Sequence, residues 1–416
     1  MMRFFPKFLV LAALIGGCSG QKVNQELMEG VWRGVLDVQG HDLAFNFAVK
    51  KDSVNNYNVF IKNASENLLL DEISFANDSV NMTLHIFDAV LRAKVSGDSL
   101  KGYFIKNFAK NYKIPFRAAY NQDYRFAADD NRFPDQRFEG KYKVTFVNES
   151  DTTPAIGIFA HKAGNVIEGT FLTPTGDYRF LEGNVVDDKL YLSTFDGNYA
   201  YLFTAEKTSD TTLRGDYWSG LSWHQTWTAS RNDNVTLPDA ESMTYLKDGY
   251  DKIDFKFPDV NGNIISPSDE KYKNKVLILQ LFGTWCPNCM DETKFLAPWY
   301  KENRDRGVEI IGLAYESKPE FEYASERVKK MIAKMDVDYD FVIGGTRDKA
   351  EASKTLPMLN RVVAFPTTIY IGKDGKVKKI HTGFSGPGTG IYYQRFIERF
   401  NETVNELLNE NLAFDE

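Results

Sequence analysis

Cysteine is scarce in this sequence: 416 residues contain only Cys18, Cys286 and Cys289. A fold held together by several disulfides is therefore excluded. The sequence also lacks metal-ligand spacing, because there is no second cysteine pair to complete a four-ligand zinc site. The five histidines are equally scattered, at His41, His85, His161, His224 and His381. We therefore expect no metal site and a special role for the close pair Cys286 and Cys289.

Long apolar runs and an excess of positive charge are absent as well. Beyond the N-terminus no segment has 18 uninterrupted apolar residues, so we expect no membrane-spanning helix. The 50 basic and 57 acidic residues give a net charge of -7, which argues against nucleic acid as a partner. A chain of 416 residues predicts two to three domains rather than one small module.

The N-terminus has the composition of a targeting segment. Arg3 and Lys7 precede an apolar run over residues 8–15, and two glycines then lead to Cys18. The run is too short to span a bilayer as a helix. The pattern resembles the bacterial lipoprotein signal, which implies removal of residues 1–17, a lipid on Cys18 and an extracytoplasmic, membrane-anchored protein that faces the periplasm. An ordinary signal peptide that leaves Cys18 free is the alternative.

After a tether over residues 18–29, the pattern up to residue 229 is that of β-strands. Short runs of alternating polarity, such as residues 43–49 and 81–87, are separated by Asn, Asp, Gly and Ser clusters, as in half-buried antiparallel strands. Nothing in this region has the spacing of a long amphipathic helix.

The β-region also repeats itself. The sequence at Gly30 recurs in weaker form at Gly140, and Phe87-Asp88 recurs as Phe195-Asp196. We therefore expect an all-β region of two related units, residues 30–126 and 136–230, each a small barrel or sandwich.

A linker over residues 231–251 leads to a segment, residues 252–416, in which strand and helix patterns alternate. This order predicts an α/β domain with a mixed sheet. Its expected strands are residues 276–282, 308–314 and 339–343 and a hairpin over 367–372 and 377–381, and its expected helices are 291–304, 320–335, 348–359 with Pro357 as an interruption, and 392–408.

Trp285-Cys286-Pro287-Asn288-Cys289 follows the first of these strands and opens a helix. Cys286 falls at the helix N-cap, where free N–H groups and the helix dipole favour a thiolate. Pro287 falls at the first helical position, where a missing N–H costs nothing. Cys289 lies one turn further and can reach back to close a disulfide. We therefore predict a redox-active disulfide with Cys286 as nucleophile and Cys289 as resolving thiol, which requires a Cys286 sulfur that a substrate can reach.

Residues 252–408 resemble the thioredoxin-fold proteins, and most closely the TlpA/ResA-like thiol-disulfide oxidoreductases of bacteria. Phe365-Pro366-Thr367 matches the cis-proline loop of that family, which implies that these residues dock the substrate beside the reactive sulfur, with Trp285 and Pro287 shaping the same surface. Glu292 matches a buried glutamate, which implies a role in proton transfer. Lys294 stands where the family usually has proline, and Phe365 is bulkier than usual.

The resemblance implies disulfide-containing client proteins as substrates, a membrane thiol reductant as electron donor, and no cofactor. Asn288 is neutral, and Asp291 and Glu292 oppose a further negative charge, which should raise the thiol pKa values and favour a reductase. If the strand at 367–372 runs antiparallel to the strand at 276–282, His381 and the loop 383–388 reach the same edge, so that this loop is a candidate docking surface.

Two other functions remain open. A thiol peroxidase would need a Pro-x-x-x-Thr-x-x-Cys site, and the residues before Cys286 and Cys289 do not supply one. The chain could also be mainly a β-domain binding module with an accessory redox domain, because the β-region carries aromatic residues such as Trp218 and Trp223 that fit either a core or a docking platform.

Overall fold

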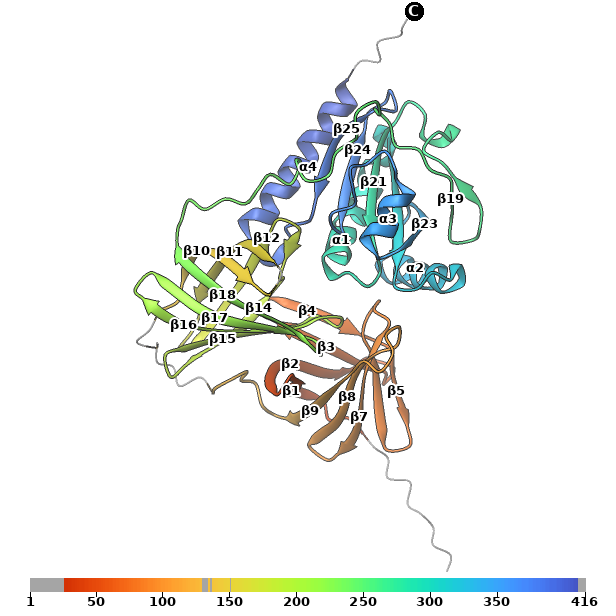
Figure 1. The fold of residues 1–416 in the computed structure, drawn as a ribbon. Helices are drawn as coiled ribbons and strands as arrows, with labels where there is room; N and C mark the ends of the chain where they lie inside the picture. Colours follow the sequence, from red (N-terminus) through yellow and green to blue (C-terminus); the bar gives the residue numbers. More distant parts are fainter. Residues whose placement is uncertain (1–25, 129–133, 135–136, 150, 411–416) are drawn as a thin grey trace, which may run out of the picture.

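The computed structural model describes residues 26–128, 134, 137–149 and 151–410. Figure 1 shows the β-region, in red to green, beneath a C-terminal α/β domain in teal to blue. The predicted signal peptide, the lipid site Cys18 and most of the tether lie outside the described residues. Within those residues, no helix is both long and apolar enough to cross a membrane.

The first β-unit is a nine-stranded antiparallel sheet with the order β4-β3-β2-β1-β9-β8-β7-β6-β5. Its strands are β1 (Gly30–Val38), β2 (His41–Lys51), β3 (Tyr57–Asn63), β4 (Glu66–Leu70), β5 (Ile73–Ala76), β6 (Ser79–Thr83), β7 (Ala89–Ser96), β8 (Ser99–Lys106) and β9 (Lys113–Tyr120).

The second β-unit is also nine-stranded, with the order β11-β10-β18-β17-β16-β15-β14-β12-β13, and an additional β11–β12 pairing closes it into a barrel. Its strands are β10 (Gly140–Val147), β11 (Thr152–His161), β12 (Val166–Thr173), β13 (Gly176–Asp177), β14 (Leu181–Val186), β15 (Lys189–Phe195), β16 (Ala200–Ser209), β17 (Thr212–Ser219) and β18 (Trp223–Arg231). The predicted all-β character of the region is confirmed.

The two units share one connectivity. In each, the first strand pairs with both the second and the last strand, β1 with β2 and β9, and β10 with β11 and β18. Both first strands start at a glycine with positive φ, 133° at Gly30 and 136° at Gly140, a conformation that other residues rarely adopt. The sequence repeat thus coincides with equivalent places in the two sheets.

The strand predicted over residues 81–87 ends early, at Thr83. Phe87 N donates to Leu84 O in a turn, and His85 takes a left-handed φ of 51°. Leu84 and Ile86 are nevertheless fully buried. The alternating polarity of this segment therefore does not mark a strand. It reflects burial of Leu84 and Ile86 against the α/β domain, where Arg327 donates to the Ile86 carbonyl.

The α/β domain has a five-stranded mixed sheet with the order β23-β22-β21-β24-β25, in which β21, β22 and β23 are parallel and β24 and β25 antiparallel. This is the predicted thioredoxin-like arrangement. Its strands are β21 (Val276–Phe282), β22 (Val308–Glu316), β23 (Asp340–Thr346), β24 (Thr367–Ile371) and β25 (Val377–Thr382), with a small β19 (Phe257–Pro258) and β20 (Ile264–Ile265) before them.

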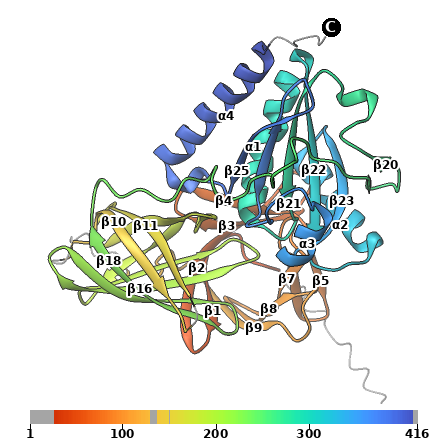
Figure 2. The same ribbon diagram turned by 45° about the horizontal axis from the view of Figure 1, so that its top comes forward.

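Four helices flank this sheet, α1 (Pro287–Asn303), α2 (Phe321–Met335), α3 (Lys349–Thr355) and α4 (Ile391–Asn409), with short 3-10 turns at Glu270–Tyr272, Arg304–Arg306 and Pro387–Thr389. Helix α1 begins at Pro287 and not at 291, because Cys286 caps it. Helix α3 ends two residues before Pro357, whose ring does not fit a helix interior. Figure 2 shows α4 along one side of the domain, above β10 and β11.

The β-region and the α/β domain are packed into one another. A single cluster of buried apolar side chains contains members of both, including Phe87 and Val328. Around it, Tyr323 of α2 donates to Asp88 at 3.0 Å and Lys330 pairs with Glu72 at 2.8 Å. The β-region is therefore a fixed neighbour of the α/β domain in this structure.

Candidate redox site

The Cys286–Cys289 pair lies where β21 gives way to α1. Cys286 is the N-cap residue, with extended backbone at φ -102° and ψ 110°, and Pro287 follows at the start of the helix. The Cys286 Sγ accepts a hydrogen bond from Cys289 N at 3.2 Å, so a negative charge on this sulfur would meet a backbone donor and the positive end of the helix dipole. The two residues are joined as a disulfide with their Cα atoms 5.2 Å apart.

The Phe365–Pro366 loop lies directly against this sulfur. The Phe365–Pro366 peptide bond is cis, and Cys286 Sγ is 3.6 Å from the Phe365 carbonyl oxygen. The loop is placed here because β24 runs antiparallel to β21, with Thr367 opposite Leu281. The ring of Phe365 packs edge-on against Trp285, with ring centroids 5.9 Å apart.

Glu292, three residues after Cys289 in α1, is buried, with 1% of its surface exposed. Its carboxylate accepts hydrogen bonds from Thr368 Oγ1 at 2.6 Å and from Gln280 Nε2 at 2.8 Å. Burial raises the pKa of Glu292 to about 7, and the two hydrogen bonds oppose the rise without cancelling it. A carboxyl group with this pKa can both give and take a proton at neutral pH.

Sequence reasoning missed the partners of Glu292. Gln280 carried a usable signal, because it is the one polar residue in the apolar run of β21. Thr368 carried none beyond its place after Thr367. Lys294, at the position where the resembling family has proline, is partly exposed and lies 3.7 Å from Asp291.

Cys286 offers only a small part of its surface to solvent in this arrangement of the chain, less than the sequence led us to expect. Only 5% of Cys286 and none of Cys289 is exposed. Two side chains of the β-region contact the residues on either side of Cys286: Asn198 Nδ2 donates to the Trp285 carbonyl at 2.5 Å, and Arg179 Nη1 donates to the Pro287 carbonyl at 3.0 Å. The sequence held no local sign of these contacts.

The loop 383–388 does reach the edge of the pair, since Gly383 N donates to the Pro366 carbonyl at 2.9 Å. Its outer side is occupied by the β-region: Gly386 N donates to Asp177 Oδ2 at 2.6 Å. His381 lies opposite Thr368 in the hairpin, and burial lowers its pKa to about 4. In this structure the candidate docking loop therefore contacts its own chain.

Arg179 changes the electrostatics on which the predicted direction of electron flow was based. Its guanidinium, 2% exposed, pairs with Asp291 of α1 and with Glu66 of the first β-unit. Burial opposes its charge, but Asp291, Glu66 and Asp196 together raise the pKa of Arg179 above its usual value. Asp291 thus has a cation beside it and is not the free negative charge expected from the sequence.

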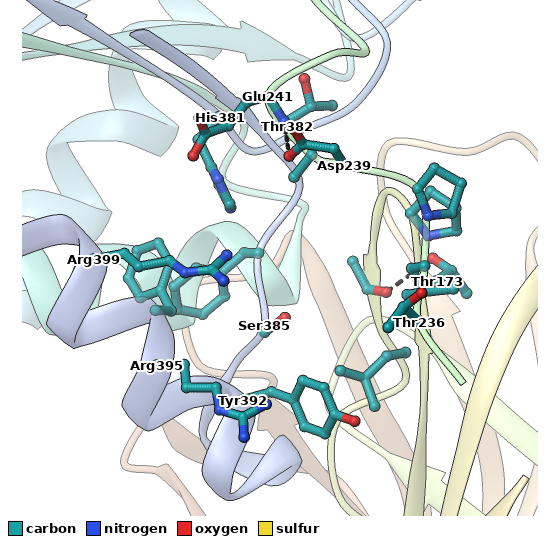
Figure 3. Close-up of a pocket in the computed structure, with 18 of the residues that line it drawn as sticks. Thr173, Thr236, Asp239, Glu241, His381, Thr382, Ser385, Tyr392, Arg395 and Arg399 are labelled. Atoms are coloured by element: carbon teal, nitrogen blue, oxygen red, sulfur yellow. Dashed lines mark hydrogen bonds between the residues drawn. The ribbon is translucent and has the colours of Figure 1, made fainter. Parts of the chain in front are cut away.

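A separate cavity of about 430 Å³ lies between α4, β25, the linker and β12. Figure 3 shows Arg395, Arg399 and Tyr392 on its α4 side and Thr173 and Thr236 across from them. None of Cys286, Cys289, Trp285 or Phe365 lines it. No group of three or more His, Cys, Asp or Glu side chains suited to a metal occurs among the described residues.

Comparison with known proteins finds relatives that are thiol-disulfide oxidoreductases. Residues 246–392 match the family model described as Redoxin. Thiol-disulfide oxidoreductase ResA of Bacillus subtilis (strain 168) is 32% identical over 139 residues, which cover 33% of this chain and 69% of that protein. Thiol-disulfide oxidoreductase ResA of Halalkalibacterium halodurans is 27% identical over 135 residues, which cover 32% of this chain and 68% of that protein.

Among solved structures, a thiol:disulfide interchange protein of the thioredoxin family from Chlorobium tepidum TLS aligns over 39% of this chain and 100% of its own, at 19% identity and a TM-score of 0.30. The ResA of Bacillus subtilis decides the assignment, because it is 32% identical to this chain and the match covers 69% of its own length. The chain belongs to the ResA family of thiol-disulfide oxidoreductases.

Proposed function

We propose that this thiol-disulfide oxidoreductase is extracytoplasmic and reduces disulfides of client proteins through Cys286 and Cys289. The observation that carries the proposal is the N-cap geometry of Cys286, whose sulfur accepts the Cys289 N–H beside the cis-proline loop. A sulfur so placed is stabilised as a thiolate, the form that attacks disulfides.

The reaction is a two-electron exchange in two steps. The Cys286 thiolate attacks one sulfur of the client disulfide, forms a mixed disulfide and releases the other client sulfur as a thiolate. The Cys289 sulfur, as thiolate, then attacks Cys286 Sγ, which closes the Cys286–Cys289 disulfide and releases the second client thiolate. The two thiol protons end on the client sulfurs, and a membrane thiol reductant returns two electrons to the pair.

Individual roles follow from position. Glu292, with its pKa near neutral, accepts the proton of Cys289 and passes it on. Phe365, Pro366 and Thr367 offer an extended backbone edge to a client strand, with Trp285 and Pro287 beside it. No cofactor is needed, because the thiols carry the electrons.

The cellular context in this proposal comes from the N-terminus and the composition. A lipid on Cys18, after removal of residues 1–17, tethers the protein to the membrane. We assign residues 18–29 as tether, 30–126 and 136–230 as β-units, 231–251 as linker and 252–416 as the redox domain. The ResA relatives favour disulfide exchange over the peroxidase alternative, and they match about a third of this chain.

The assignment as a reductase rests on Asn288 and Glu292, because Asp291 is paired with Arg179 and is not a free negative charge. Asn288 itself adds no cation between the cysteines, although the Arg179 guanidinium donates to the Pro287 carbonyl there. A charged Glu292 disfavours a second negative charge close by. We therefore expect the Cys286 thiol of the reduced protein to be less acidic than that of an oxidase. A Cys286 pKa near 4, measured from the pH dependence of alkylation, would assign an oxidase.

Insulin reduction by the full chain tests the proposal. We expect the wild-type protein to accelerate reduction in dithiothreitol and the Cys286→Ser variant to show only the background rate. The Cys289→Ala variant should accumulate a mixed disulfide with insulin, visible on a non-reducing gel. Equal activity of wild type and Cys286→Ser would reject the function.

A further inference from the structure

Arg179 connects both β-units and the α/β domain at the redox site. It follows β13 in the second unit, pairs with Glu66 at the start of β4 in the first unit, and pairs with Asp291 in α1. The same guanidinium also donates to the carbonyl of Pro287, between the two cysteines. Its backbone takes a left-handed φ of 58°.

The loops around Arg179 contact the residues that surround Cys286. We call residues 174–179 and 196–198 the cover. Asn198 of the cover donates to the Trp285 carbonyl, and Asn288 donates to the Asp177 carbonyl at 3.2 Å. Polar groups on both sides of Cys286 are therefore occupied by the β-region.

The cover is also fitted against the loop that follows β25. A Cβ atom on Gly383 would lie 2.8 Å from the Thr175 carbonyl carbon, and one on Gly388 would lie 2.7 Å from backbone atoms of Arg179. Backbone thus meets backbone at this junction, with no room for an inserted strand. The surface on which a client strand would lie is already in contact with the chain itself.

Buried polar contacts hold the cover in place, but some of the polar atoms have no hydrogen-bond partner among the described residues. Asp196 arranges the Asn198 loop by accepting from Asn198 N at 2.9 Å and Tyr199 N at 2.6 Å. Its other oxygen, Asp196 Oδ2, and the Arg179 Nε have no hydrogen-bond partner among the described residues and lie 3.8 Å apart. A buried ionic group with unfilled hydrogen-bonding capacity adds little net stability but fixes one arrangement.

From these contacts we propose that Arg179 determines substrate specificity by holding the cover over Cys286, so that small disulfides react with the closed protein while folded protein clients react only after the cover moves aside. The inference rests on the proposed function of the cysteine pair. A protein client needs a contact area of several hundred Å² around its disulfide, whereas a small disulfide needs access to one sulfur.

The size of the effect follows from the hydrogen bonds that a substitution of Arg179 removes. Arg179→Met eliminates the charge-assisted hydrogen bonds to Pro287 and Asp291, and losing even one such bond shifts an equilibrium between closed and open forms by about tenfold or more. We expect the single-turnover rate with insulin to rise at least about tenfold, and the rate with hydroxyethyl disulfide to change less than about threefold.

Arg125→Met is the matched control. Arg125 is also an arginine with 2% side-chain exposure, but its partners, among them Ser193, Lys62 and Glu182, all lie in the β-region. Its loss removes a buried charge without touching the redox site. Asn198→Ala is a milder second variant that keeps Arg179 and removes only the contact with Trp285.

The experiment uses full chains reduced beforehand, freed of reductant and mixed with either substrate, followed by an acid quench. The thiols left on the enzyme chain itself are then counted from the mass that a maleimide adds to it, because the exchange transfers thiols to the substrate without changing their total. A raised ratio of insulin to hydroxyethyl disulfide rates in Arg179→Met or Asn198→Ala, with the Arg125→Met ratio unchanged, supports the inference. Unchanged ratios in both cover variants, equal rises on both substrates, or the same rise in Arg125→Met would overturn it. Failure of the proposed function is distinguished by Cys286→Ser, which would then reduce insulin as fast as wild type.

Discussion

Arg179 and Asp291, 112 residues apart in the sequence, form a buried ion pair that joins the β-region to the first turns of the redox helix. The pair places an arginine of the β-region beside the first turns of α1, the helix that contains Cys289. Because Asp291 also has Lys294 within 3.7 Å, its carboxylate is paired from both sides.

Asp291→Asn measures how much that ion pair contributes to the free energy of unfolding. The substitution leaves Arg179 with Glu66 and Asp196 but removes its partner on α1, and breaking a buried pair in this way costs about 3 kcal/mol of unfolding free energy. Urea denaturation followed by circular dichroism measures the loss. Lys294→Met, which removes only the half-exposed partner of Asp291, should cost less than about 0.5 kcal/mol; equal losses in the two variants would contradict the assignment.

Glu292→Gln should change how stability depends on pH. The pKa of Glu292 in the folded protein, about 7, lies above that of an unfolded glutamate, ~4.3, so the folded state binds more protons between these values. Its contribution to the free energy of unfolding therefore increases as pH falls from about 7 to about 4.

Urea unfolding at pH 8 and pH 5 checks this sign. The wild-type protein should gain about 2 kcal/mol more than Glu292→Gln over that interval. Glu302→Gln, an exposed carboxylate of the same helix, serves as control and should follow the wild type. A Glu292→Gln protein with the wild-type pH dependence would show that Glu292 does not titrate in this range.

Gly176→Ala introduces a steric clash between the cover and Asn288. A Cβ atom there would lie 2.5 Å from Asn288 Nδ2, so the Asn288 side chain or the cover must shift. In the reduced protein we expect a single turnover with insulin to be at least about threefold faster than in wild type, as the closed form loses its Asn288 contact. Gly40→Ala has a similar positive-φ strain with nothing within 4 Å and should leave the rate unchanged. No change in Gly176→Ala would mean that the cover does not limit access.

The local parts of the site could be predicted from the sequence because short-range patterns encode them. The apolar run of residues 276–282 corresponds to β21 residue for residue, and Pro287 after Cys286 marks the start of a helix. Pro366 at the head of β24 follows from the antiparallel pairing of two recognisable strands.

The cover could not be predicted, because tertiary contacts alone create it. Arg179 and Asn198 reach the site from turns of a barrel. The repeat at Phe195-Asp196 lies just before Asn198, but it indicates related β-units and not a contact with the α/β domain. The same limit explains the error at residues 84–87, where alternating burial came from a neighbouring domain. Asp291 was misinterpreted for the related reason that its partner lies far away in the sequence.

The most direct test of the account is the order in which the two thiols react. After reduction with dithiothreitol, the full chain is treated with limiting iodoacetamide, and the modified cysteine is identified by peptide mass. We predict that the Cys286–Cys289 disulfide opens under mild reductant and that Cys286 is alkylated at least about 100-fold faster than Cys289, because only Cys286 lies at the helix N-cap. A disulfide that resists reduction, or a Cys289 that reacts as fast as Cys286, would contradict it.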